Sequence, residues 1–237
     1  MTGTGAVLLF GFLLGMRHAT DADHVVAVST IVSKTKRLGA AWLLGAVWGL
    51  GHSTTVFLVG ALIVLGKLSI PERAAAGLEA LVGAMLIALG AWSLLGRERH
   101  GVTAHSHDDH PPHLHLPGPG AFEDFLQQAG RGELLRSAAV GLVHGLAGSA
   151  AAALLVLTAI PEPRAALLYL LVFGVGTLCG MLALSAAMEY SLVRLAALWR
   201  PGRFGLAAAT GALSVAMGLW IIVHNAGILG AAATAAR

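Results

Sequence analysis

The sequence predicts an all-α, polytopic membrane protein with six transmembrane helices, arranged as two inverted three-helix repeats. Three observations lead to this fold class. The 237 residues are 57% hydrophobic and only 11% charged, whereas soluble domains carry about 25% charged residues. Apolar runs long enough to cross a hydrocarbon core, which takes about 20 helical residues, occur six times. The third observation is a similarity between the two halves of the chain.

The predicted spans follow one another through short connections that contain Pro, Gly and charged residues, which are typical of turns between helices. They cover Gly5 to Val32, Gly39 to Leu65, Ala74 to Leu95, Leu134 to Ile160, Ala165 to Ala187 and Phe204 to Leu229. Only the connection between the third and fourth spans is long. The chain therefore divides into a first three-helix repeat at 1–96, a loop at 97–133 and a second three-helix repeat at 134–237.

The basic residues are unevenly distributed between the two sides of the predicted bundle. Ten of the 15 Lys and Arg residues lie in or beside loops one, three and five, and four lie on the opposite side. Because loops rich in Lys and Arg stay in the cytoplasm, we expect those three loops to be cytoplasmic and both termini to lie outside. No basic face or aromatic-basic module is present, so nucleic acid is not an expected partner.

Three segments of the first half recur in the second half at nearly constant spacing. They are 15–18 (GMRH) with 141–144 (GLVH), 49–51 (GLG) with 174–176 (GVG), and 83–92 with 211–220, at offsets of 126, 125 and 128 residues. Three spans per half is an odd number, so the second half must enter the membrane in the opposite orientation. Many secondary transporters place a midplane site between such repeats.

Charged and polar residues interrupt the middle of the first predicted span. They are Arg17, His18, Asp21, Asp23 and His24. Each Asp or Arg at that depth opposes insertion by about 2.5 to 3.5 kcal/mol, so these side chains must face a partner, water or an ion. Arg17 and Asp21, four residues apart, could neutralise each other. The carboxylate and the two imidazoles that remain suit Ni²⁺, Co²⁺, Zn²⁺ or Mn²⁺.

Helical geometry limits how these residues could bind one ion. At 100° per residue, His18, Asp21 and His24 fall within one sector of a regular helix while Asp23 points away from it. We therefore expect local unwinding, as in the discontinuous helices of transporters. The alternative is that Asp23 orients a histidine instead of binding the ion itself.

The second predicted span adds an imidazole and hydroxyl groups to an otherwise apolar, Gly-rich helix. His52 is followed by Ser53, Thr54 and Thr55, and its alternative role is a hydrogen bond between helices. His144, the repeat partner of His18, could line the same path or serve a structural hydrogen bond. The predicted metal-binding residues are His18, Asp21, Asp23, His24 and His52, with His144, Ser53 and Thr54 as residues of the pathway.

The long loop is rich in histidine. Six of the eleven histidines lie in it, at His100, His105, His107, His110, His113 and His115. Such a tract, which also contains prolines, cannot bury a core and is expected to be largely disordered. Its position predicts a cytoplasmic segment that holds metal ions with little specificity, or else a solvated linker.

These motifs resemble those of the nickel/cobalt transporter (NiCoT) family. Segment 17–25 (RHATDADHV) is similar to that family's His-x4-Asp-His signature, and segment 51–56 (GHSTTV) resembles its second motif. The second half looks like that of the short, six-helix bacterial relatives. The resemblance implies energy-coupled movement of Ni²⁺, sometimes Co²⁺, across the cytoplasmic membrane. It also implies that His18, Asp23, His24 and His52 occupy the family's functional positions.

The expected function is secondary transport of Ni²⁺, with Co²⁺ as a second substrate, in the direction of uptake. Because histidines must be neutral to bind metal, acid pH is expected to weaken nickel uptake. Export for metal resistance and a metal-binding accessory protein without transport are the alternatives. No His-Glu-x-x-His pattern or separate general base favours an enzyme, and no bound cofactor is expected. The expected partners are a divalent transition-metal ion, the lipid bilayer and a cytoplasmic metallochaperone; the sequence predicts no oligomeric state.

Overall fold

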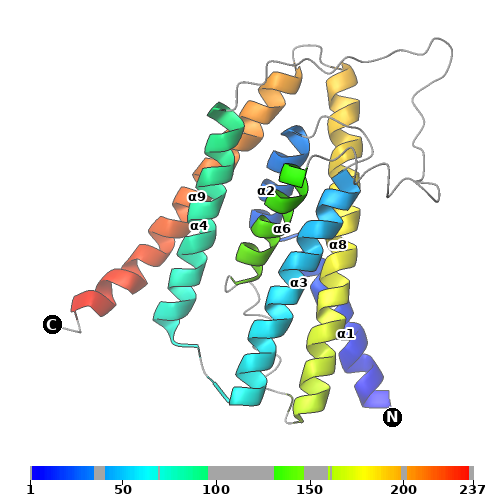
Figure 1. The fold of residues 1–237 in the computed structure, drawn as a ribbon, viewed down its shortest axis with the longest axis vertical. Helices are drawn as coiled ribbons and strands as arrows, with labels where there is room; N and C mark the ends of the chain where they lie inside the picture. Colours follow the sequence, from blue (N-terminus) through cyan, green and yellow to red (C-terminus); the bar gives the residue numbers. More distant parts are fainter. Residues whose placement is uncertain are drawn as a thin grey trace.

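The computed structural model describes residues 2–34, 41–68, 70–95, 131–146, 160, 162–198 and 202–234. These residues form seven helices, and no strand occurs among them (Figure 1). The helices are α1 (Thr2–His18), α2 (Ala22–Lys34), α3 (Ala41–Gly66), α4 (Glu72–Leu95), α6 (Arg131–Gly145), α8 (Pro163–Leu198) and α9 (Gly202–Thr234). The predicted His-rich segment and the later part of the predicted fourth span lie outside the described residues.

Four of these helices, α3, α4, α8 and α9, are long and apolar enough to cross a membrane. They correspond to the predicted second, third, fifth and sixth spans. The shorter apolar helices α1 and α2 together cover the predicted first span. The chain is therefore a multi-pass membrane protein. Helix α8 continues beyond the predicted end at Ala187 to Leu198, because the added residues include several strong helix formers such as Leu, Ala and Arg.

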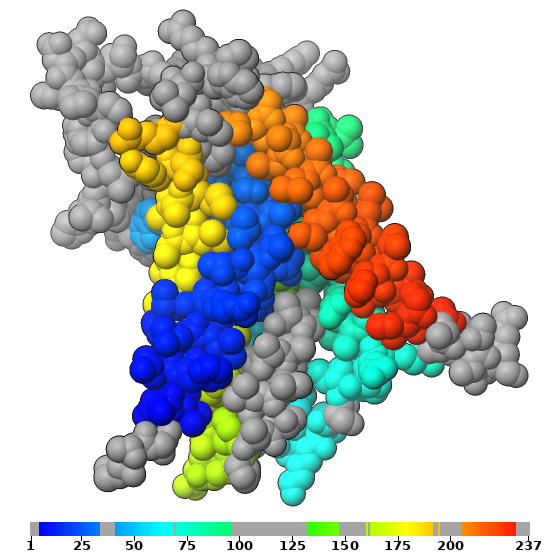
Figure 2. Space-filling view, turned by 180° about the vertical axis from the view of Figure 1, so that it is seen from behind, coloured from blue at the N-terminus to red at the C-terminus, as the bar shows by residue number. Residues whose placement is uncertain are grey.

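The helices pack as a bundle with an attached pair. Helices α3 and α8 run antiparallel beside each other, with α1 against α8 and α6 against α3 (Figure 1). Helices α4 and α9 contact each other extensively. Helix α2 connects the two groups, since it contacts α4, α8 and α9. Seen from behind, α2 (blue) lies between α8 (yellow) and α9 (orange) (Figure 2).

Glycines allow the closest helix contacts. A Cβ atom on Gly15 of α1 would overlap the backbone oxygen of Phe173 in α8, and one on Gly141 of α6 would overlap the backbone oxygen of Trp48 in α3. Association of helices in lipid depends on such close packing because no hydrophobic effect drives it. These two contacts hold α1 and α6 tightly against the α3–α8 pair.

Glycines also allow close contact between α4 and α9. A Cβ on Gly83 would meet the backbone oxygen of Gly218, and a Cβ on Gly218 would meet that of Gly83. Gly90 and Gly211 face each other in the same reciprocal way. The two backbones therefore approach closely at two levels along the crossing.

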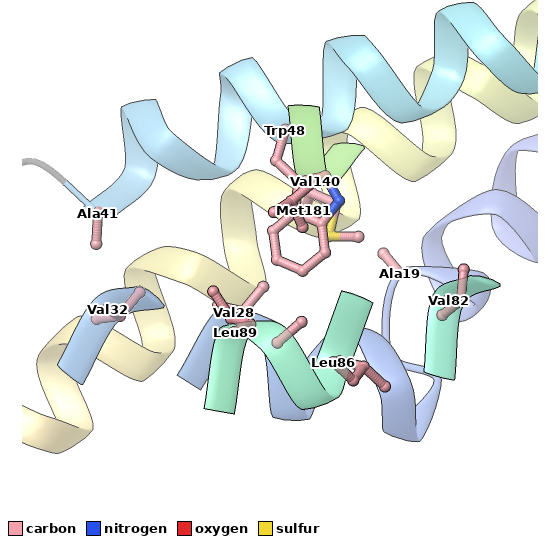
Figure 3. Packing of buried hydrophobic residues seen from close by; sticks show 11 residues of the cluster. Ala19, Val28, Val32, Ala41, Trp48, Val82, Leu86, Leu89, Val140 and Met181 are labelled. Carbon is pink, nitrogen blue, oxygen red and sulfur yellow. The ribbon is translucent and has the colours of Figure 1, made fainter. Parts of the chain in front are cut away.

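Two buried apolar clusters lie along the bundle. The first contains Trp48, whose ring points from α3 toward Val140 of α6 and Met181 of α8 (Figure 3). The second joins five residues of α3 and α8, namely Val56, Ala166, Tyr169, Leu170 and Phe173. Trp48 and Phe173 each expose only 1% of their surface.

Candidate metal centre

The candidate centre is built around the interruption between α1 and α2. Helix α1 ends at His18 and α2 begins at Ala22. The intervening turn is closed by backbone hydrogen bonds from Thr20 N–H to the Arg17 carbonyl (2.9 Å) and from Asp21 N–H to the His18 carbonyl (3.0 Å). The predicted local unwinding is thus confirmed. Asp23 lies in the first turn of α2, where the helix dipole favours a negative charge.

Four histidines from four helices meet at this interruption. His24, His52 and His144 have no exposed surface, and His18 exposes 5%. The ring centroid of His24 lies 4.2 Å from that of His144, 4.7 Å from that of His18 and 5.1 Å from that of His52. His24 is therefore the central member. His144, which was predicted as a residue of the pathway, thus lies in contact with the predicted metal-binding residues.

Two carboxylates contact three of these histidines, each through one ring nitrogen. Asp21 Oδ2 lies 2.8 Å from His18 Nδ1. Asp23 Oδ1 lies 3.2 Å from His24 Nδ1, and its Oδ2 lies 2.8 Å from His144 Nε2. A carboxylate that accepts one imidazole N–H leaves the other nitrogen with a lone pair aimed at a metal. This geometry favours the interpretation in which the Asp side chains orient histidines.

Among the described residues, most of the remaining ring nitrogens are not bound by another group of the protein. His24 Nε2, His52 Nδ1 and His144 Nδ1 have no hydrogen-bond partner in the described part of the chain. His18 Nε2 and His52 Nε2 are 3.2 Å apart. Buried polar atoms without partners are uncommon in proteins, so the three histidines with such nitrogens are chemically suited to bind a ligand.

Two overlapping groups of side chains have ligand atoms within 4.8 Å of one another. One is His18, His24 and His52, and the other is Asp23, His24 and His144. Imidazole and carboxylate are ligands that first-row divalent transition metals accept. The centre can therefore offer an ion three imidazoles, or two imidazoles and a carboxylate.

Several residues of interest lie outside this cluster. Arg17 is exposed, and Asp21 pairs with His18 instead of with Arg17. The neutralising Arg17–Asp21 pair considered from the sequence is therefore absent from the described residues. Ser53 Oγ donates to the Gly174 carbonyl of α8 (2.9 Å). Thr54 is exposed and donates to the carbonyl of Leu50, one turn earlier (2.7 Å). The structure does not bring either hydroxyl to the histidines.

Two aromatic residues next to the centre were missed by sequence reasoning. The Trp48 ring is nearly parallel to the His24 ring, at 11°, with centroids 6.1 Å apart, and lies 5.7 Å from His144. The Phe173 ring lies 5.5 Å from His18. The internal repeat could have pointed to both, because positions 48 and 173 are separated by the 125-residue offset of the second repeated segment.

Apolar helices that span a membrane around a buried His and Asp cluster define a multi-pass membrane protein with a candidate transition-metal centre. Comparison with known proteins agrees with this class. The urease accessory protein UreH of Bacillus sp. (strain TB-90) is 37% identical over 182 residues, which cover 75% of this chain and 74% of that protein. The chain therefore belongs to the nickel/cobalt transporter family, and the resemblance of its motifs is confirmed.

Shorter matches involve proteins named as nickel transporters. The high-affinity nickel transport protein of Cupriavidus necator is 38% identical over 69 residues, or 29% of this chain and 19% of that protein. The nickel transporter NicT of Mycobacterium tuberculosis is 41% identical over 59 residues, or 24% of this chain and 16% of that protein. No family model matches the chain, and no solved structure matches it significantly.

Proposed function

We propose that this protein is a secondary transporter that takes up Ni²⁺, with Co²⁺ as a second substrate, across the cytoplasmic membrane. One observation carries the proposal: four buried histidines from both halves of the chain converge at a helix interruption. A centre enclosed by membrane-spanning helices is poorly placed for storing metal at a surface. It is well placed for an ion that enters from one side and leaves on the other.

The ion would exchange its water for imidazole nitrogens at the centre. His18, His24 and His52 provide the three-imidazole group, while Asp21 and Asp23 hold the Nδ1 atoms of His18 and His24. The nearby carboxylates also offset the double positive charge of an ion taken out of water, which an apolar interior alone would oppose strongly.

Reciprocal contacts support two inverted three-helix repeats, 1–96 and 134–237. The Gly15–Phe173 contact and the Gly141–Trp48 contact are equivalent at offsets of 126 and 125 residues. The contact of α1 with α8 likewise corresponds to that of α6 with α3. In our proposal the repeats rock about the histidine cluster. Both termini lie outside, and the loop at 97–133 is cytoplasmic.

Two other functions have particular support. A cytoplasmic loop with six histidines would suit an exporter that collects metal inside the cell. The name of the relative UreH, a urease accessory protein, would suit a membrane protein that binds metal for a cytoplasmic metallochaperone without transporting it. Transport is our first choice over an accessory role because two matched relatives are named as nickel transport proteins. The change in cell nickel decides between uptake and export.

Accumulation of radioactive nickel in cells that express the full chain tests the proposal. Uptake predicts more cell nickel than in cells with empty vector, and His18→Ala or His24→Ala should reduce it to that background. His224→Ala is the matched control, since His224 is an exposed histidine of α9. Lower cell nickel would instead indicate export. Liposomes that contain the chain as sole protein and take up no nickel would indicate an accessory role.

A further inference from the structure

We infer that the transported ion occupies two successive positions that share His24. The outer position is formed by His18, His24 and His52, and the inner position by Asp23, His24 and His144. "Outer" denotes the side of the α1 N-terminus and "inner" the opposite side. The inference rests on the proposed transport function and assigns the inner position as a metal site of its own.

The geometry separates the two positions. In each group the three ligand atoms lie within 4.8 Å of one another. Bonds from imidazole to Zn²⁺, another first-row divalent ion, are about 2.1 Å long, so ligand atoms around such an ion lie within about 4 Å of one another. Each group needs only a small contraction to reach that spacing. His52 and His144 belong to different groups. Their ring centroids are 6.0 Å apart, whereas ring centroids within a group are 4.2 to 5.2 Å apart.

His24 makes the two positions successive. Its Nδ1 faces Asp23 at 3.2 Å and its Nε2 has no hydrogen-bond partner among the described residues. We assign this Nε2 to both groups, which share His24, so separate ions could not fill both positions at the same time. An ion can instead remain on His24 while the bonds to His18 and His52 break and bonds to His144 and Asp23 form. It is never without a protein ligand during the move.

The two positions differ in chemistry. The outer one offers three neutral imidazoles, and the inner one replaces an imidazole with a carboxylate. To bind the ion, Asp23 exchanges its contact with His144 Nε2 for a bond to the metal. The first set favours borderline transition metals, whereas an oxygen ligand discriminates less strongly among divalent ions. Selection would thus take place at the outer position and release from the inner one.

An aromatic ring lies beside each position. Phe173, of the apolar cluster that includes Tyr169 and Leu170, lies against His18. Trp48, of the other apolar cluster, lies against His24 and His144. The two rings come from the antiparallel helices α8 and α3 (Figure 1). In our proposal, movement of Phe173 exposes the outer position, and movement of Trp48 exposes the inner one.

Binding and transport by the purified full-length protein, measured with radioactive nickel, test the inference. His144→Ala removes only the inner group, so nickel should bind to detergent-solubilised protein with a Kd within about threefold of wild type. Transport into liposomes should fall at least about tenfold. His18→Ala should weaken binding itself by at least about tenfold. His224→Ala is again the control for both measurements.

Visible absorption of bound Co²⁺ gives a second measurement. His52→Ala should leave the inner group and His144→Ala the outer group, so the two variants should give different Co²⁺ spectra. Identical spectra would indicate one shared position and overturn the inference. It is also overturned if His144→Ala transports at the wild-type rate, or if both His144→Ala and the size-matched His144→Asn lose binding as His18→Ala does. Wild-type protein that neither binds nor transports nickel would contradict the proposed function instead.

Discussion

The two halves of the chain make matching glycine contacts between helices but differ in their polar residues. Helix α1 ends at His18, and α6 ends at Gly145, one residue after the repeat partner His144. After that point the first half continues with Asp21, Asp23 and His24, whereas the corresponding positions in the second half are Ala147, Ser149 and Ala150. His144 is nevertheless held by a carboxylate, that of Asp23 from the other half. One half therefore supplies a carboxylate that holds histidines of both halves.

The largest expected effect falls on the residue common to both metal groups. His24→Ala removes a ligand from the outer and the inner position together, so nickel accumulation in cells should fall to the vector background. His144→Ala and His52→Ala each spare one group and should retain nickel binding that His24→Ala lacks. Equilibrium binding of nickel to the purified variants checks this order. Binding by His24→Ala equal to that of His144→Ala would contradict it.

The next effect compares the two carboxylates of the first half. Asp23 contacts two histidines and is 17% exposed, whereas Asp21 contacts one and is 40% exposed. Loss of a carboxylate that orients a metal-binding histidine typically costs about 10- to 100-fold in affinity or activity. We expect Asp23→Asn to reduce the initial rate of nickel uptake by an amount near the upper end of this range. Asp21→Asn should reduce that rate by an amount near the lower end. Equal losses would show that Asp23 does not serve both halves.

A smaller effect tests whether the two halves pack equivalently. Gly15→Ala and Gly141→Ala each place a Cβ against a backbone oxygen, and such overpacking costs about 1 to 3 kcal/mol. Both variants should lower the thermal unfolding midpoint in detergent by similar amounts. Gly77→Ala is the control, because nothing lies within 4 Å of its Cβ position. A loss confined to one of the two variants would contradict equivalent packing.

The smallest effect separates the two hydroxyls predicted for the pathway. Ser53→Ala loses the hydrogen bond to the Gly174 carbonyl between α3 and α8, worth about 0.5 to 1.5 kcal/mol. Thr54→Ala loses only a bond within its own helix. A slightly lower unfolding midpoint is expected for Ser53→Ala alone, and nickel uptake should not change in either variant. Reduced uptake by Thr54→Ala would place that hydroxyl on the ion's path.

Much of the fold follows from hydropathy, because crossing the hydrocarbon core requires long apolar helices. The break in the first span was predictable as well, since a regular helix cannot direct His18, Asp23 and His24 to one point. The role of Asp23 was not fully predictable. Its Oδ2 reaches a histidine 121 residues away, and that contact depends on how α6 packs against α3. The positions of Trp48 and Phe173 likewise depend on glycine contacts between helices.

The length of α8 has an electrical consequence for an ion at this centre. Its apolar segment Pro163–Ser191 contains 29 residues, or about 43 Å at 1.5 Å per residue, and Tyr190 with the nearby Arg194 is suited to the membrane interface. Phe173, beside His18, lies well inside that segment. An ion at the centre would thus have crossed a large part of the membrane voltage. For a divalent ion, half of 100 mV corresponds to about 2.3 kcal/mol, enough to make both arrival and departure depend on voltage.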